Sequence, residues 1–140
     1  MSPESAVAVA AIFVWLGMVA AISFIEAPLK FRAPGVTLQI GLGIGRLVFR
    51  ALNACEFVLA VAVAVVFVVE PPPMTAFVAA GVAVLALLVQ VLAVRPRLTK
   101  RSDAVLAGGE GPRSHAHFWY VGFELVKVVG LLVAGVCLLA

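Results

Sequence analysis

Residues 47–94 read LVFRALNACEFVLAVAVAVVFVVEPPPMTAFVAAGVAVLALLVQVLAV, and this stretch sets the class of the protein. It contains two apolar runs, 47–69 and 75–94, joined by the turn Glu70-Pro71-Pro72-Pro73. A helix needs about 20 mostly apolar residues to cross the hydrocarbon core of a bilayer. Each run reaches that length, so the stretch predicts two transmembrane helices that run in opposite directions.

Two further apolar runs, 6–27 and 118–140, flank this pair. Hydrophobic residues make up 64% of the 140 residues and charged residues only 12%, a balance far from that of soluble domains. The first run is preceded by Glu4 and by no Lys or Arg, and it is too long for the apolar part of a signal peptide. We therefore predict an all-α integral membrane protein, with residues 1–140 forming one four-transmembrane-helix bundle.

The basic residues indicate how the bundle is oriented. Nine of the ten lie in or beside two connections, the first after span one and the second after span three: Lys30, Arg32, Arg46, Arg50, Arg95, Arg97, Lys100, Arg101 and Arg113. By the positive-inside rule both connections are cytoplasmic, which puts the N-terminus and the C-terminus outside. No nucleic-acid recognition motif accompanies the net charge of +3. The partner expected for these residues is the lipid bilayer with its anionic headgroups, not nucleic acid.

Proline and threonine mark the expected helix ends. Pro28 is expected to end span one, and Arg95-Pro96-Arg97 to close span three, because proline disfavours continued helix. The charged, Gly-rich stretch 98–114 is expected to be an exposed, mobile loop. Residues 36–46 are expected either to begin the second helix early, with Thr37 as its N-cap, or to form a short interfacial helix.

Three glycines, Gly41, Gly43 and Gly45, invite comparison with a phosphate-binding loop. Such loops need a Gly-Lys-Ser/Thr ending after a strand or a βαβ unit, and a four-helix membrane chain offers neither. The spacing of Gly41 and Gly45 is instead typical of small residues at a close helix contact.

The fourth span carries a stripe of polar residues. His117, Tyr120, Glu124 and Lys127 follow one another at spacings of three, four and three, which places them on one helix face. Charged residues inside a membrane are costly, about 2.5–3.5 kcal/mol each on insertion scales, and usually face the interior of a bundle. Lys127 is close enough to neutralise Glu124, so a structural ion pair is one interpretation of these two residues.

A second stripe starts from the same end of span two, at spacings of four, three and three: Arg46, Arg50, Asn53 and Glu56. Glu26 in span one and Gln90 in span three lie near the cytoplasmic ends of their spans. Every helix is therefore expected to deliver a polar group to the cytoplasmic half of the bundle.

This asymmetry predicts a polar cavity in the cytoplasmic half that binds or passes a small polar ligand, a proton or an ion. Glu56 and Glu124 would carry the charge and Lys127 would be their counter-ion. A network that only fixes helix register is the structural alternative. No metal is expected, because the di-iron pattern Glu-x-x-His is absent and Arg50 and Lys127 would repel a cation.

One resemblance covers nearly the whole chain. The stretches SFIEAPLKFRAPG at 23–35 and GLGIGRLVF at 41–49 resemble a family of short bacterial four-span membrane proteins that is itself uncharacterised, and the likeness extends to Gln90, His117, Tyr120, Glu124 and Lys127. The resemblance implies a location in the bacterial cytoplasmic (inner) membrane and no particular activity.

A second, local resemblance brings an activity with it. FRALNACEF at 49–57 looks like the second-helix motif of the membrane-associated proteins of eicosanoid and glutathione metabolism, the MAPEG family. It implies a glutathione-dependent homotrimeric enzyme in which Arg50, Asn53 and Glu56 are glutathione ligands. The chain departs from the motif, because Arg50 precedes Asn53 by three residues instead of four. The tyrosine and arginine of the catalytic members also have no clear match in 78–94, so whether the protein is an enzyme stays open.

Overall fold

A computed structural model describes residues 1–108 and 116–140 of the chain. These residues form helices and no strand. In chain order the elements are α1 (Pro3–Val19), the π-helical segment η1 (Ala20–Glu26), α2 (Ala27–Lys30), α3 (Leu38–Val69), α4 (Met74–Val89), the π-helical segment η2 (Gln90–Val94), α5 (Arg95–Leu106) and α6 (Ala116–Leu139). The predicted all-α architecture is confirmed.

Four continuous helical rods are long and apolar enough to cross a membrane: Pro3–Lys30, Leu38–Val69, Met74–Leu106 and His117–Leu139. They contain the four predicted spans. The first three are longer than predicted, and α3 alone has 32 residues. At a rise of about 1.5 Å per residue it is about 48 Å long, well beyond the roughly 30 Å of a bilayer's hydrocarbon core.

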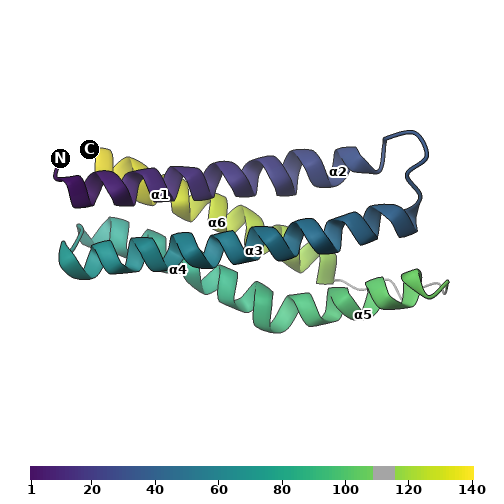
Figure 1. Ribbon diagram of the computed structural model, residues 1–140. Helices are drawn as coiled ribbons and strands as arrows, with labels where there is room; N and C mark the ends of the chain where they lie inside the picture. The colour runs from purple at the N-terminus through teal and green to yellow at the C-terminus, as the bar shows by residue number, and fades with distance from the viewer. Residues whose placement is uncertain (109–115) are drawn as a thin grey trace.

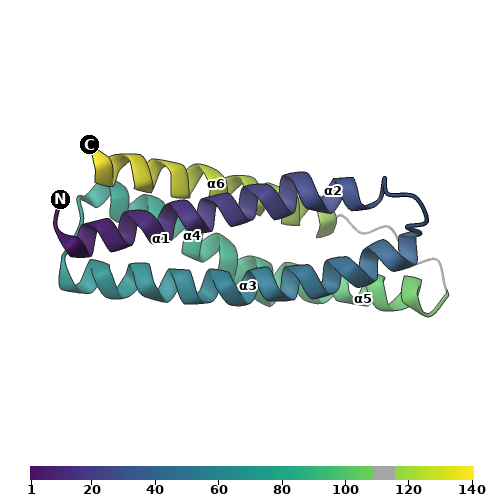
Figure 2. The same cartoon turned by 45° about the horizontal axis from the view of Figure 1, so that its top comes forward.

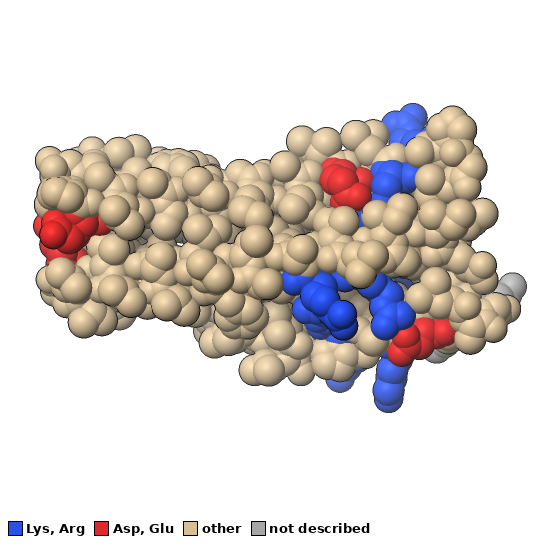
Figure 3. Space-filling model, viewed as in Figure 1, with Lys and Arg blue, Asp and Glu red and all other residues tan. Residues whose placement is uncertain are grey.

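The rods lie side by side in one bundle with two chemically different ends (Figures 1 and 2). The N-terminus, the C-terminus and the turn between α3 and α4 meet at one end, which we call the proline end after Pro71, Pro72 and Pro73. The connection from α2 to α3 and the helix α5 lie at the other end. Figure 3 shows Lys and Arg gathered toward this second end, which we call the basic end, and an uncharged stretch between it and the acidic residues at the proline end.

The helices are arranged around the bundle in the order α3, α1, α6, α4. The most extensive packing is between α4 and α6, followed by α1 with α3 and α1 with α6, whereas α3 and α4 meet only weakly. The α4 face against α6 is built from small residues, among them Ala79 and Ala83, which are almost fully buried. A Cβ built on Gly130 of α6 would lie 2.9 Å from the main-chain oxygen of Ala79. Small residues thus let these two backbones approach closely.

Neither Pro28 nor Pro96 ends its helix, so the predicted ends of spans one and three were wrong. Each proline follows a π-helical segment, in which the amide of Ala27 bonds the oxygen of Ile22 and the amide of Arg95 bonds that of Gln90, five residues back. A proline within an α-helix lacks the amide hydrogen and clashes with the carbonyl four residues earlier. The wider π turn before each proline relieves both problems, and the chain continues helically.

The expected loop at 98–114 is partly a helix, because α5 continues to Leu106. Residues 109–115 of that stretch lie outside the described part of the chain. At the start of α3 the prediction of an early beginning is confirmed. Thr37 is the N-cap, and its Oγ1 accepts a hydrogen bond of 3.2 Å from the amide of Ile40.

The glycine face of α3 packs against the same chain. A Cβ on Gly41 would lie 2.1 Å from the ring of Phe31, and one on Gly45 would lie 3.0 Å from Nζ of Lys30. Because Gly41 and Gly45 have no side chain, Phe31 and Lys30 can lie directly against α3. The interpretation of Gly41 and Gly45 as a close contact is confirmed, and the contact is within one subunit.

Candidate functional site

Lys127 lies at the centre of a buried polar network. Its Nζ is 2.6 Å from Oε2 of Glu56 on α3 and 2.5 Å from Oε1 of Glu124, one turn earlier on α6. All three side chains are almost completely buried. A single cation thus serves two carboxylates in the interior of the bundle, where an unpaired charge would be costly.

Further side chains satisfy the oxygens of Glu56. The indole Nε1 of Trp15 on α1 donates a hydrogen bond of 2.7 Å to Oε2 of Glu56. The amide Nδ2 of Asn53 donates one of 3.1 Å to Oε1. The Oδ1 of Asn53 in turn accepts from a guanidinium nitrogen of Arg95 at 3.0 Å. Asn53 thus connects Glu56 to Arg95, which makes no direct ion pair with either carboxylate of the network.

One side chain from each π-helical segment donates a hydrogen bond to Glu124. Nε2 of Gln90, the first residue of η2, donates a hydrogen bond of 2.8 Å to Oε1 of Glu124 and another of 3.0 Å to the main-chain oxygen of Tyr120. The hydroxyl of Ser23, within η1, donates to Oε2 of Glu124. π-helical turns are rare and are frequent at functional sites. Here both of them present a donor to the same carboxylate.

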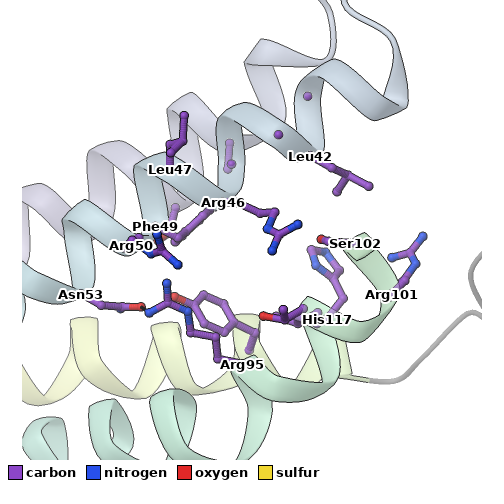
Figure 4. Close-up of a pocket in the computed structure, with 18 of the residues that line it drawn as sticks. Leu42, Arg46, Leu47, Phe49, Arg50, Asn53, Arg95, Arg101, Ser102 and His117 are labelled. Atoms are coloured by element: carbon purple, nitrogen blue, oxygen red, sulfur yellow. Dashed lines mark hydrogen bonds between the residues drawn. The ribbon is translucent and has the colours of Figure 1, made fainter. Parts of the chain in front are cut away.

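A large cavity lies next to this network, toward the basic end. Its volume is about 1310 Å³, and its lining comes from η1 and α2, the first half of α3, η2 with α5, and the first turns of α6. Figure 4 shows it between α3 and α5, with Arg46, Arg50, Arg95 and His117 directed into it. Glu124, Asn53 and Ser23 belong both to the cavity lining and to the network.

The charges around the cavity are strongly unbalanced. Among the described residues, its lining includes one carboxylate, Glu124, and five cationic side chains: Lys30, Arg46, Arg50, Arg95 and Arg101. Glu124 is already paired with Lys127.

Two of the five cations have acidic partners elsewhere. Lys30 lies 3.7 Å from Oε2 of Glu26, and a guanidinium nitrogen of Arg46 lies 2.8 Å from Oδ1 of Asp103 on α5. Among the described residues, the other three arginines have no acidic partner: Arg50, Arg95 and Arg101.

Two buried polar atoms at the cavity also lack a hydrogen-bond partner in the described part of the chain. One is the hydroxyl of Tyr120, whose side chain is 8% exposed, and the other is Nε of Arg101. The rings of Tyr120 and Phe49 form a T-shaped pair, with centroids 5.5 Å apart and planes at 86°. Buried donors without partners are uncommon in native proteins, and each calls for an explanation such as a ligand or water.

Eight of the nine predicted site residues belong to one or both of two overlapping groups. Those that line the cavity are Arg50, Asn53, His117, Tyr120 and Glu124. Those that form the buried network are Asn53, Glu56, Gln90, Glu124 and Lys127. Glu26 belongs to neither group, because its carboxylate faces Lys30. The polar groups that every helix was expected to deliver thus form a buried network with a cavity beside it.

Four residues of these two groups were missed by the sequence reasoning: Trp15, Ser23, Arg95 and Arg101. The indole of Trp15 is an obligatory donor in the middle of an apolar span, which is a signal that could have found it. Arg95 was expected at the close of span three and Arg101 in a loop, and only the helical course of α5 brings both to the cavity. For Ser23 the sequence holds no comparable signal.

The motif that resembles the MAPEG family is divided between the two groups. Arg50 and Asn53 line the cavity, whereas Glu56 is fully buried and is taken up by Trp15 and Lys127. Comparisons of the chain with models of known families, with curated proteins and with solved structures found no match. Both resemblances therefore stay predictions, and the argument for a function rests on the geometry of the cavity.

Proposed function

We propose that the protein is an integral membrane protein that binds a small anionic ligand in the cavity at its basic end. The observation that carries this proposal is the group of three cavity arginines, Arg50, Arg95 and Arg101, without an acidic partner in the described part of the chain. The sequence alone favoured any small polar ligand, proton or ion. The surplus of positive charge narrows that choice to an anion.

The chemistry of the lining suits an oxyanion. Arginine presents several N–H donors in a planar fork, which matches the oxygens of phosphate or carboxylate groups. Figure 4 shows Arg50 of α3 and Arg95 at the start of α5 approaching one another at one side of the cavity. The unpartnered hydroxyl of Tyr120 adds a donor to the same lining. A bound oxyanion would supply acceptors to these groups and offset the repulsion between the arginines.

In this proposal the buried network supports the cavity and does not itself take up the ligand. Glu56, Gln90 and Lys127 do not line the cavity, and their hydrogen bonds join all four rods. The structural alternative, in which polar groups fix helix register, therefore applies to these residues. Glu124 lies at the border between the two and would place a fixed negative charge at the cavity floor.

We also propose that the basic end lies in the cytoplasm, which follows from the positive-inside rule and the position of Lys30, Arg32, Arg97 and Lys100 beyond the apolar part of their spans. The proline end, with Glu4 and Glu70, would then face the outside. The ligand would reach the cavity from the cytoplasm or from the cytoplasmic leaflet of the membrane.

The test is the stabilisation of detergent-purified protein by anions. Inorganic phosphate, glycerol 3-phosphate, glutathione and the single-chain lipid lysophosphatidic acid are compared with a cation, choline, at matched ionic strength. A ligand at one hundred times its Kd stabilises the folded state by about 2.7 kcal/mol, a shift that is readily seen in thermal unfolding. We expect at least one anion to stabilise the protein saturably and choline to have no effect.

Matched arginine variants assign the effect to the cavity. Arg50→Gln is expected to weaken the anion's stabilisation, because Arg50 lines the cavity and makes no ion pair with the described residues whose loss would disturb the fold. Arg97→Gln removes the same charge from an exposed residue of α5 outside the cavity lining and is expected to change nothing. The proposal is wrong if none of the four anions stabilises the wild-type protein, or if both variants weaken the effect equally. Stabilisation by glutathione alone would favour the glutathione-dependent alternative.

A further inference from the structure

We propose that the ligand is an amphiphile, an oxyanion headgroup on an apolar chain, that enters the cavity from the membrane leaflet at the basic end. This inference rests on the proposed anion-binding function and adds the chemical class of the ligand and its route. Three observations carry it: the depth of the cavity, the apolar character of most of its wall, and its size.

The depth of the cavity follows from counting along the rods. A span of about 20 residues covers the hydrocarbon core. We counted about 20 residues along each rod, starting from its end at the proline end. The count reaches Ser23 in the first rod, Arg50 in the second, Val94 in the third and Tyr120 in the fourth. The four rods thus reach the same boundary at the same level.

That boundary crosses the deeper part of the cavity. Ser23, Arg50, Arg95 and Tyr120 line the cavity at this level, and the lining residues of α3 from Gly41 to Phe49 lie further toward the basic end. Asn53, Val91 and Glu124 lie about one helical turn deeper and form the floor. The headgroup layer on each side of a bilayer is about 5–7 Å thick, which corresponds to about four residues of helix. Arg50 and Arg95 are therefore at the level of lipid headgroups, and the part of the cavity beyond them lies within the headgroup layer.

The wall is largely apolar in spite of its arginines. Apolar lining side chains come from η1, from α3 and from the rod that continues into α5: Phe24, Leu42, Leu47, Val91, Leu98 and Leu106. Figure 4 shows Leu47 on the same stretch of α3 as Arg46 and Arg50. The Leu47 side chain is 70% exposed, so one edge of the cavity is continuous with the apolar outer surface of the bundle.

An amphiphile can interact with both the arginines and the apolar side chains of this wall. A fully hydrated anion would leave the apolar wall in water, whereas an apolar chain would leave the arginines without acceptors. The volume of about 1310 Å³ also exceeds the roughly 300–1,000 Å³ that is usual for pockets of small soluble ligands. Room remains for a chain beyond a headgroup that contacts Arg50, Arg95 and the Tyr120 hydroxyl.

The experiment separates the headgroup from the chain. Binding to the protein in a neutral maltoside detergent is measured for lysophosphatidic acid, for glycerol 3-phosphate, which has the same headgroup and no chain, and for lysophosphatidylcholine, which has the same chain and a zwitterionic headgroup. We expect lysophosphatidic acid to bind about tenfold or more tightly than either control, because only it combines charge-assisted hydrogen bonds with apolar burial.

Two variants test the two halves of the site separately. Arg50→Gln is expected to lower the affinity for lysophosphatidic acid by about tenfold or more, and to leave lysophosphatidylcholine binding unchanged. Leu47→Gln changes an exposed residue and is expected to weaken lysophosphatidic acid without affecting glycerol 3-phosphate. Arg97→Gln is the control for charge and should leave all three affinities as they are.

The possible failures are distinguishable. If glycerol 3-phosphate binds as tightly as lysophosphatidic acid, the source is a soluble phosphate, so the amphiphile proposal is overturned and the anion-binding function stands. If lysophosphatidylcholine binds as tightly as lysophosphatidic acid and Arg50→Gln lowers neither affinity, the cavity is an apolar groove without anion recognition at Arg50, and both proposals fail. If none of the three compounds binds, the amphiphile proposal fails. The anion-binding function then depends on whether phosphate or glutathione stabilises the protein in the thermal unfolding experiment.

Discussion

Lys127 of α6 and Glu56 of α3 form a fully buried ion pair, with Nζ 2.6 Å from Oε2, across the diagonal of the bundle. These two helices are not neighbours in the packing order, since α1 lies between them on one side and α4 on the other. The pair therefore joins elements that apolar packing alone does not bring together. Because a buried ion pair adds little net stability but is strongly disrupted when one partner is lost, its main effect is to specify which arrangement of the four helices forms.

Removal of the central cation should therefore destabilise the fold. Lys127→Met leaves Glu56 and Glu124 buried without a counter-ion, and loss of one partner of a buried pair costs about 3–5 kcal/mol. We expect a decrease of that size in the free energy of unfolding, measured by denaturant titration in mixed micelles. Lys100→Met, at an exposed residue of α5, is the control and should change little.

A second substitution checks the cause of this effect. The double variant Lys127→Met/Glu56→Gln removes a negative charge together with the cation and should recover part of the lost stability. Equal stability of Lys127→Met and the wild-type protein would show that the network does not hold the helices together.

The hydrogen bond from Trp15 to Glu56 can be tested against the chain's second tryptophan. Trp15 is fully buried and donates to a carboxylate, a bond worth about 1.5–3 kcal/mol. Trp15→Phe should lower the free energy of unfolding by about that amount. Trp119 is 61% exposed, so Trp119→Phe should change it by no more than about 0.5 kcal/mol. Similar losses for both variants would contradict a specific role of the indole hydrogen bond.

The close approach of α4 and α6 predicts opposite effects for two glycines of the same helix. In Gly130→Ala the new methyl group would lie 2.9 Å from the main-chain oxygen of Ala79, so α6 must move away from α4. Overpacking of this kind costs about 1–3 kcal/mol. Around Gly122 there is nothing within 4 Å of an added Cβ, and Gly122→Ala should stabilise the helix by about 0.5–1 kcal/mol. Thermal unfolding of the two variants should therefore shift in opposite directions.

The orientation in the membrane can be tested with single cysteines. In a background of Cys55→Ala and Cys137→Ala, we expect Glu4→Cys at the proline end to react with a membrane-impermeant maleimide in spheroplasts. Lys100→Cys at the basic end should react only after lysis. Both positions are exposed, so access depends on the side of the membrane. The reverse pattern would place the arginine cavity outside the cell and contradict the proposed orientation.

The inward direction of the charged stripes could be predicted from the sequence. The deeper members of the two stripes, Asn53, Glu56, Glu124 and Lys127, are all 3% exposed or less. The members nearest the basic end are exposed: Arg46, Arg50 and His117. A charge in an apolar span must avoid the lipid, and the spacing of three or four residues then selects one helix face. The same reasoning failed for Glu26, because a residue near the end of a span can pair with a cation of its own helix, here Lys30 four residues later.

The extent of the helices at the basic end could not be predicted in this way. Proline rules placed the ends of two spans at Pro28 and Pro96, yet each helix continues through a preceding π turn. Local propensity contains no information about that turn, which is stabilised by tertiary contacts such as the bonds of Ser23 and Gln90 to Glu124. Since α5 is part of this continuation, the positions of Arg95 and Arg101 at the cavity could not be predicted either.

The sequence by itself determined the four apolar helices, the concentration of positive charge at one end and the inward face of each polar stripe. These properties depend on hydrophobic length, charge and helical period, which are local quantities. Only the tertiary structure decided that Lys127 meets Glu56 across the bundle, and that three arginines remain around a cavity without acidic partners among the described residues. The order of helices around the bundle decides both, and apolar surfaces that face lipid and apolar surfaces that face other helices look alike in sequence.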